Sequence, residues 1–278
     1  MLELYWLPKL VNKLVTKKYQ WNAIDYSVNS SNQKRWAFEN IWKLNLNGNE
    51  RILDIGCGDG KITAELSKII PYGFVIGIDN SEDMIELAKS SYETGKFPNL
   101  QFHLMDASRL DFNSIFDIVF SSSALHWILE HNPVLQGIFN SLRPGGKVFL
   151  QMGGKGNAKE FIDNINWVIN RDWHNYFINF KFPWAFYSPD EYMNLLVDAG
   201  FKIVRLELVP KIMVHKNADS LKGWIRTTWH PYIERIPVQM REKFMNDVVD
   251  SYLDKGFIDN ESNIIVNMVR LEVEAIKP

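Results

Sequence analysis

Strand-like segments alternate with helix-like segments through residues 51–152. Runs of β-branched and other apolar residues predict strands at 51–56, 73–80, 100–107, 116–123 and 146–153. Apolar residues at helical spacing predict helices at 60–70, 81–95 and 132–146. Because right-handed crossovers place the connecting helices over both faces of a parallel sheet, this alternation predicts a doubly wound α/β fold.

Two further segments with strand-like alternation follow, at 202–209 and 268–276. A helix is predicted just before the first of them, with Ser188 as N-cap, Glu191 completing a capping box and Gly200 as the stop. We therefore expect a mostly parallel seven-stranded sheet with an antiparallel hairpin at one edge.

The remaining segments are expected to cover this core. At 278 residues, 46% of them hydrophobic, the chain can bury one large core and a smaller helical cap. No linker composition separates the pieces, so we expect a single domain, 1–278. Its predicted parts are a core at 35–152, 188–209 and 263–278, an N-terminal lid at 1–34, and cap insertions at 153–187 and 210–262.

Charge and cysteine content limit the partners. A formal net charge of -2 gives no broad positive surface for nucleic acid. The single cysteine, Cys57, excludes an intrachain disulfide and fits a reducing cytoplasm. No apolar run approaches the roughly 18 to 20 residues that span a bilayer, and the N-terminus lacks a signal-peptide pattern. We expect a cytoplasmic protein with no nucleic-acid or membrane partner; the sequence leaves its oligomeric state open.

Three glycines at every second position follow the first predicted strand: Gly56, Gly58 and Gly60. Glycines there allow a tight turn and a close approach of a ligand to the backbone. A dinucleotide-binding turn would need glycine at the position that Lys61 occupies, and the chain has no P-loop run. Neither phosphate-binding motif fits this turn.

Polar residues also follow the next predicted strands, where ligands of such sheets bind. They are Asp79 with Asn80, Asp106 with Ala107, and 121–123. Asp79 can accept hydrogen bonds from a vicinal diol such as a ribose, and Asp106 from an exocyclic amine. The ligand that these groups describe is a nucleoside.

The pattern D-x-G-C-G-x-G at 54–60, with acids ending the next two strands, resembles the class I S-adenosylmethionine (SAM) dependent methyltransferases. The resemblance implies their Rossmann-like fold and SAM as cofactor, with S-adenosylhomocysteine as product. It also implies that Asp79 binds the ribose and Asp106 the adenine amine. The residues expected at the cofactor site are Tyr26, Gln33, Asp54, Gly56, Cys57, Gly58, Asp79, Asn80, Met84, Asp106, Ala107 and Ser122.

Other segments resemble the small-molecule carboxyl methyltransferases typified by trans-aconitate and juvenile hormone acid methyltransferases. In that group an aromatic residue and a Gln or Arg close over the methionine end of SAM, and Tyr26 and Gln33 match them. The segments that carry the resemblance are 19–42, 124–127 (Ala-Leu-His-Trp), 218–237 and 269–278.

The predicted activity is therefore O-methylation of a carboxylate on a small molecule. A carboxylate is ionised at neutral pH and needs no general base, so orientation and exclusion of water can carry the reaction. We assign no acid or base and expect no metal. The candidates to orient the acceptor are His126, Trp127 and Arg226. Arg226 could equally be a solvated helix residue, and His126 and Trp127 could equally be structural residues.

Two alternatives stay open at the level of sequence. The acceptor could be a phenol, an amine or a carrier-bound acid, and His126 would then be a candidate base because its unperturbed pKa lies near neutrality. The chain could also be a SAM-binding partner protein without catalysis.

Overall fold

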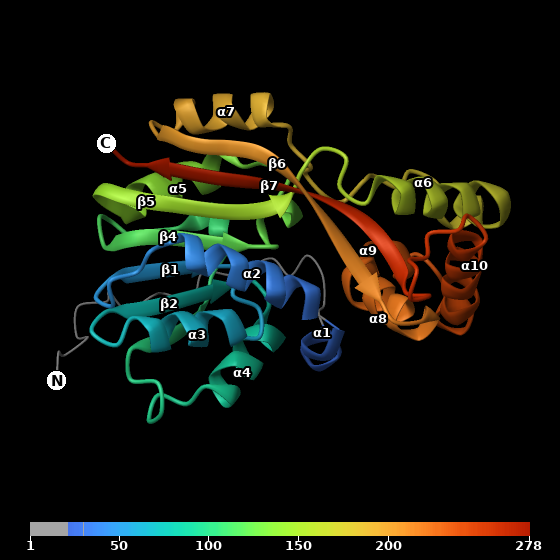
Figure 1. The fold of residues 1–278 in the computed structure, drawn as a ribbon, viewed down its shortest axis with the longest axis horizontal. Helices are drawn as coiled ribbons and strands as arrows, with labels where there is room; N and C mark the ends of the chain where they lie inside the picture. Colours follow the sequence, from blue (N-terminus) through green and yellow to red (C-terminus); the bar gives the residue numbers. More distant parts are fainter. Residues whose placement is uncertain (1–21, 30) are drawn as a thin grey trace.

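The computed structural model describes residues 22–29 and 31–278 (Figure 1). In this part of the chain seven strands form one sheet in the order β3-β2-β1-β4-β5-β7-β6. The pairs β5–β7 and β7–β6 are antiparallel and the other four pairs in this sheet are parallel, which confirms the predicted fold. The strands are β1 (Arg51–Ile55), β2 (Phe74–Asp79), β3 (Leu100–Leu104), β4 (Phe116–Ser122), β5 (Leu142–Gly153), β6 (Lys202–His215) and β7 (Ile264–Ile276).

Helices pack on both faces of the sheet. Alternate residues of β1 show the division, because Ile52 packs with one set of helices and Leu53 with the other. The Ile52 face is covered by α2 (Ser31–Lys43), α3 (Lys61–Ile69) and α4 (Glu82–Ser91). The Leu53 face is covered by α5 (Asn132–Ser141) and α7 (Pro189–Asp198). The central strands β1, β2 and β4 thus bury both faces, as a doubly wound sheet requires.

The capping box predicted before α7 is confirmed. The Ser188 hydroxyl accepts a hydrogen bond from the Glu191 backbone N–H, and the Glu191 carboxylate accepts one from the Ser188 backbone N–H. Gly200 follows the helix with φ +93°, a conformation that favours glycine. These local signals fix where α7 begins and ends.

Several predicted boundaries were wrong: the last strand begins at Ile264 rather than Met268, and the helix predicted to reach Gly95 ends at Ser91. Residues 142–146, predicted to continue the helix that became α5, begin β5 instead, because Leu142 pairs with Phe116 of β4. The strand predicted to end at Val209 continues to His215 through Pro210. Proline has no N–H to donate, but β6 is the edge strand of the sheet, where a missing donor can be tolerated.

The extended β6 and β7 form a two-stranded ribbon that reaches from the sheet to a group of helices at one end of the molecule (Figure 1). These helices are α6 (Lys159–Val168), α8 (Ala218–Thr228), α9 (His230–Ile233) and α10 (Arg241–Leu253). None of the helices in the described ranges is long and apolar enough to cross a membrane. These four helices are named the cap, and we propose that they are the predicted cover of the site.

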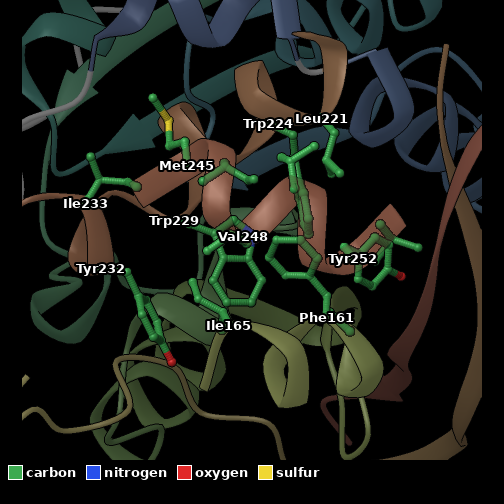
Figure 2. Packing of buried hydrophobic residues seen from close by; sticks show 14 of the residues in the cluster. Phe161, Ile165, Leu221, Trp224, Trp229, Tyr232, Ile233, Met245, Val248 and Tyr252 are labelled. Atoms are coloured by element: carbon green, nitrogen blue, oxygen red, sulfur yellow. The ribbon is translucent and has the colours of Figure 1, made fainter. Parts of the chain in front are cut away.

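The cap has an apolar core of its own (Figure 2). Phe161 of α6 lies at its centre, with ring centroids 4.7 Å from Trp229, 5.1 Å from Trp224 and 5.2 Å from Tyr252. Edge-to-face aromatic pairs of this kind favour one defined arrangement of the rings. The aromatic rings of α6, α8 and α10 and of Trp229 therefore pack into one buried cluster.

We expect Gly56→Ala to destabilise the fold more than Gly145→Ala does. The two glycines have nearly the same backbone, φ +75° and +76°, so strain of about 1–2 kcal/mol is common to both variants. A Cβ at Gly56 would lie 2.1 Å from the Ala124 Cβ, whereas nothing lies within 4 Å of one at Gly145. Urea unfolding should show an extra loss of about 1–3 kcal/mol for Gly56→Ala. Equal losses would contradict this account of the turn.

Candidate functional site

A hollow opens at the carboxyl ends of the parallel strands, where the strand order reverses between β1 and β4. Its empty volume, including the open mouth, is about 910 Å³. This strand-end hollow is lined by many of the predicted residues: Tyr26, Gly56, Gly58, Asp79, Asn80, Met84, Asp106, Ala107 and Trp127.

The glycine turn is tied to the end of β2. Asp79 Oδ2 accepts a hydrogen bond from the Gly58 N–H (3.0 Å), and Oδ1 accepts one from the Ser81 N–H (2.9 Å). Burial raises the pKa of Asp79 above its ordinary value, although these backbone donors act in the opposite direction. Each oxygen keeps further acceptor capacity for a ligand hydroxyl. Open space of at least 4 Å beyond Gly58 would let a ligand lie against the backbone.

Asp106 follows β3 and lies in the same hollow. Its Oδ1 accepts hydrogen bonds from the backbone N–H and the hydroxyl of Ser108, both 2.8 Å long. Within the described residues nothing donates to Oδ2, so this oxygen can accept from a ligand amine. Met105 and Ile128 add apolar walls beside it, which suits a flat, partly polar ring.

A second, polar hollow lies behind the glycine turn, and Tyr26, Gly56 and Gly58 line both. We call it the loop-side hollow. Asp54 lines it and accepts a 2.7 Å hydrogen bond from the Thr63 hydroxyl, while burial raises the pKa of Asp54 to about 7. The other predicted residues in its lining are Cys57 and Ser122.

The loop-side hollow offers groups suited to an amino-acid portion. The Ser122 hydroxyl is buried without a hydrogen-bond partner in the described part of the chain. Lys34, Lys61 and Asp59 add charges of both signs to the lining, and Lys61 pairs with Asp59 at 3.0 Å. The two adjoining hollows therefore fit a ligand with a nucleoside at one end and a charged amino acid at the other. The side chain of Gln33, also predicted here, lies outside the described residues.

A third hollow, the cap-side hollow, separates the sheet from the cap. Tyr26, Ser123 and Trp127 line both it and the strand-end hollow. Trp127 is fixed by aromatic neighbours: it stacks on His230 at 5.1 Å and meets Trp184 edge-on at 5.4 Å. The rest of the wall is mainly aromatic, so this hollow suits an apolar body.

His126 also lines the cap-side hollow, and its Nδ1 accepts a 3.4 Å hydrogen bond from the Gly153 N–H. The neutral ring must then carry its proton on Nε2. Burial, the Arg270 charge and His131 together lower the pKa of His126 well below its ordinary value. At neutral pH His126 is therefore an uncharged hydrogen-bond donor.

Arg226, the third predicted acceptor residue, lines none of the three hollows. It is half exposed and forms two hydrogen bonds, of 2.6 and 2.8 Å, with the carboxylate of Asp25 in α1 (Ala23–Asn29). The contact ties α1 to the cap. No contact of Arg226 among the described residues supports its predicted role at the acceptor.

Arg270 of β7 was missed at the level of sequence, although it lines the cap-side hollow. Its Nη2 donates a 2.9 Å hydrogen bond to the hydroxyl of Ser123, which belongs to the polar segment 121–123 predicted at the end of β4. The alternation of β7 held the signal: Ile264, Val266 and Met268 face inward, and the same parity takes Arg270 inward too. A charged residue at an inward-facing position of a strand points to a special role.

Residues 22–29 and 31–278 contain no group of three or more His, Cys, Asp or Glu side chains that could hold a metal ion.

Comparison with protein families matches residues 46–200 to a family described as a methyltransferase domain. An uncharacterized methyltransferase of Schizosaccharomyces pombe is 32% identical over 223 residues, which cover 78% of this chain and 83% of that protein. The juvenile hormone acid O-methyltransferase of Drosophila melanogaster is 26% identical over 236 residues, covering 81% and 78%. The matched family range includes the glycine turn, Asp79 and Asp106.

Solved structures share the fold. Phosphoethanolamine N-methyltransferase 2 of Haemonchus contortus, in complex with S-adenosyl-L-methionine, superposes with a TM-score of 0.60 at 18% identity. The match covers 98% of this chain and 61% of that chain.

We expect Asp79→Asn to weaken SAM binding by about 10- to 100-fold, because the amide replaces an acceptor that two backbone donors and the ligand would share. The matched control is Glu82→Gln, an exposed change in the first turn of the neighbouring α4. Titration calorimetry measures both affinities. Equal affinity of the Asp79→Asn variant and the unmodified protein would rule out the ribose assignment.

Proposed function

This chain belongs to the methyltransferase domain family and uses SAM, and from that membership we propose that it methylates a carboxylate of a small molecule. SAM supplies a methyl group already activated by a sulfonium. The protein's own task is then to orient the acceptor and keep out water. The observation that carries the proposal is the charge of the cap-side hollow: its described lining has a cation and neutral donors but no carboxylate.

This lining favours an anionic acceptor over the predicted alternatives. An amine that must react in its neutral form would need a base, and a phenol would also need one at neutral pH. His126 is a donor in this structure, because Gly153 occupies its Nδ1 lone pair. Burial raises the pKa of Tyr26, so its hydroxyl stays protonated as well. A carboxylate needs neither group as a base.

We also propose which residues bind each part of SAM. Asp79 would accept hydrogen bonds from the ribose hydroxyls and Asp106 from the adenine amine, while the loop-side hollow would hold the amino-acid portion. Tyr26 and Trp127 line both the strand-end and cap-side hollows. Aromatic rings at such a boundary stabilise positive charge and exclude water. Methyl transfer across this boundary would need no further catalytic group.

The similarity to a juvenile hormone acid O-methyltransferase agrees with a carboxylate acceptor, since the name of that relative is that of an acid O-methyltransferase. At 26% identity the acceptor itself does not carry over. The chemistry of the cap-side hollow is the stronger support.

The direct test uses SAM labelled on its methyl group with a panel of acids from tricarboxylates to fatty acids. We expect label to enter an ester and to be released as volatile methanol after base treatment. A matched panel of phenols and amines is the control. Base-stable transfer to one of those compounds, with no ester from any acid, would refute the carboxylate proposal.

We also expect kcat/KM for the acid to be nearly constant between about pH 6 and 9. A carboxylic acid with a pKa of roughly 4 to 5 is already ionised, and His126 titrates well below 6.5. Burial lowers the pKa of Arg270 to about 10, so acid binding should be lost only as the pH rises through that value. The assay must use saturating SAM. Burial raises the pKa of Asp54 in the loop-side hollow to about 7, so the affinity for SAM can change with pH near neutrality. A fall in kcat/KM for the acid as the pH passes through neutrality would indicate that the reaction uses a general base.

A further inference from the structure

We infer that Arg270 binds the carboxylate of the acceptor and that it selects acids with one carboxylate on an apolar body. The inference rests on the proposed function above and adds the residue and the substrate class.

Arg270 is a buried cation that forms no ion pair within the described part of the chain, although the charge of Glu272 acts on it. The residue is only 3% exposed, and its Nε is buried without a hydrogen-bond partner among the described residues. Glu272 lies two residues further along β7, but its carboxylate pairs with Lys43 and Arg205, each at 2.8 Å. Burying an unpaired charge is costly, and native proteins normally pair it. An anionic ligand in the hollow would supply the missing partner.

The guanidinium is also held in place beside the boundary between the hollows. It lies over the Trp36 ring, 5.4 Å from the centroid, and its Nη2 donates to the Ser123 hydroxyl. Ser123 itself lines both the strand-end and the cap-side hollow. A carboxylate paired with Arg270 would therefore lie close to the boundary across which the methyl group must pass.

The rest of the cap-side lining explains the preference for a single carboxylate. Arg270 is the one side chain in the described lining that is charged at neutral pH, because His126 is neutral there. A second carboxylate on the acceptor would be buried without a partner, at high cost. Most of the remaining wall is apolar: Trp184, Phe186, Met213, Trp224, Trp229 and Met268. Figure 2 shows that Trp224 and Trp229 belong to the packed core of the cap, and this packing holds the two rings in position.

The test compares dodecanoate with its neutral analogue dodecanol, each titrated by calorimetry into protein saturated with S-adenosylhomocysteine. We expect Arg270→Gln to weaken dodecanoate binding about 10- to 100-fold, the loss of a charge-assisted hydrogen bond, and to leave dodecanol and SAM binding unchanged. The matched control is Arg171→Gln, the same change at an exposed arginine of the cap outside the three hollows. It should bind all ligands as the unmodified protein does.

A second variant guards against misfolding. Arg270→Met has a similar volume and removes the unpaired charge, so we expect the ligand-free protein to keep or raise its Tm while dodecanoate binding is lost. A lower Tm together with equal losses of dodecanoate, dodecanol and SAM binding would assign Arg270 a structural role and overturn the inference.

The remaining outcomes separate the inference from the function on which it rests. Unchanged dodecanoate binding by Arg270→Gln overturns the inference alone, provided that the unmodified protein forms base-labile esters. Dodecanedioate bound as tightly as dodecanoate overturns the single-carboxylate preference. A protein that binds SAM but neither binds nor esterifies any acid refutes both proposals.

Discussion

The site depends on a few backbone hydrogen bonds that close the glycine turn against the end of β2. The N–H groups of Gly56 and Cys57 donate to the Ile78 carbonyl at 2.8 and 3.0 Å, and Gly58 donates to Asp79. These contacts fix the position of Asp79 relative to the glycine turn. Because the neighbouring parallel strands end at the same edge, Asp106 and the residues after β4 reach the same space.

The sheet and the cap contribute different chemistry to this space. Strand ends supply acceptors and open backbone, which suit a polar nucleoside. The cap supplies aromatic walls of the cap-side hollow, and β7 contributes one buried cation, Arg270, to the same lining. The ribbon of β6 and β7 belongs to both parts, so the residue that we assign to the acceptor is anchored in the sheet rather than on a mobile loop. Sites built on regular elements hold their side chains more accurately than sites on loops.

Sequence reasoning located the elements and many of the residues that line the strand-end hollow, because those signals are local. Glycine spacing, an acid after each strand and the capping box at Ser188 need only a few neighbouring residues. Arg226 and Arg270 depend on partners far away in the chain: Asp25 lies 201 residues from Arg226, and Ser123 lies 147 residues from Arg270. The early start of β5 likewise depends on pairing with Phe116. Long-range pairing of this kind leaves little trace in a single sequence.

Helix α1 has a consequence for how ligands come and go. It contacts the cap through Asp25 and the glycine loop through the Ser27 carbonyl, which accepts a hydrogen bond from Lys61. Its Tyr26 is part of the wall of all three hollows. The Tyr26 side chain thus borders the sites proposed for both ligands. Fixing its conformation when the first ligand binds lowers the entropy cost of binding the second. Cofactor and acceptor should therefore bind cooperatively, and by linkage each should raise the affinity of the other by the same factor.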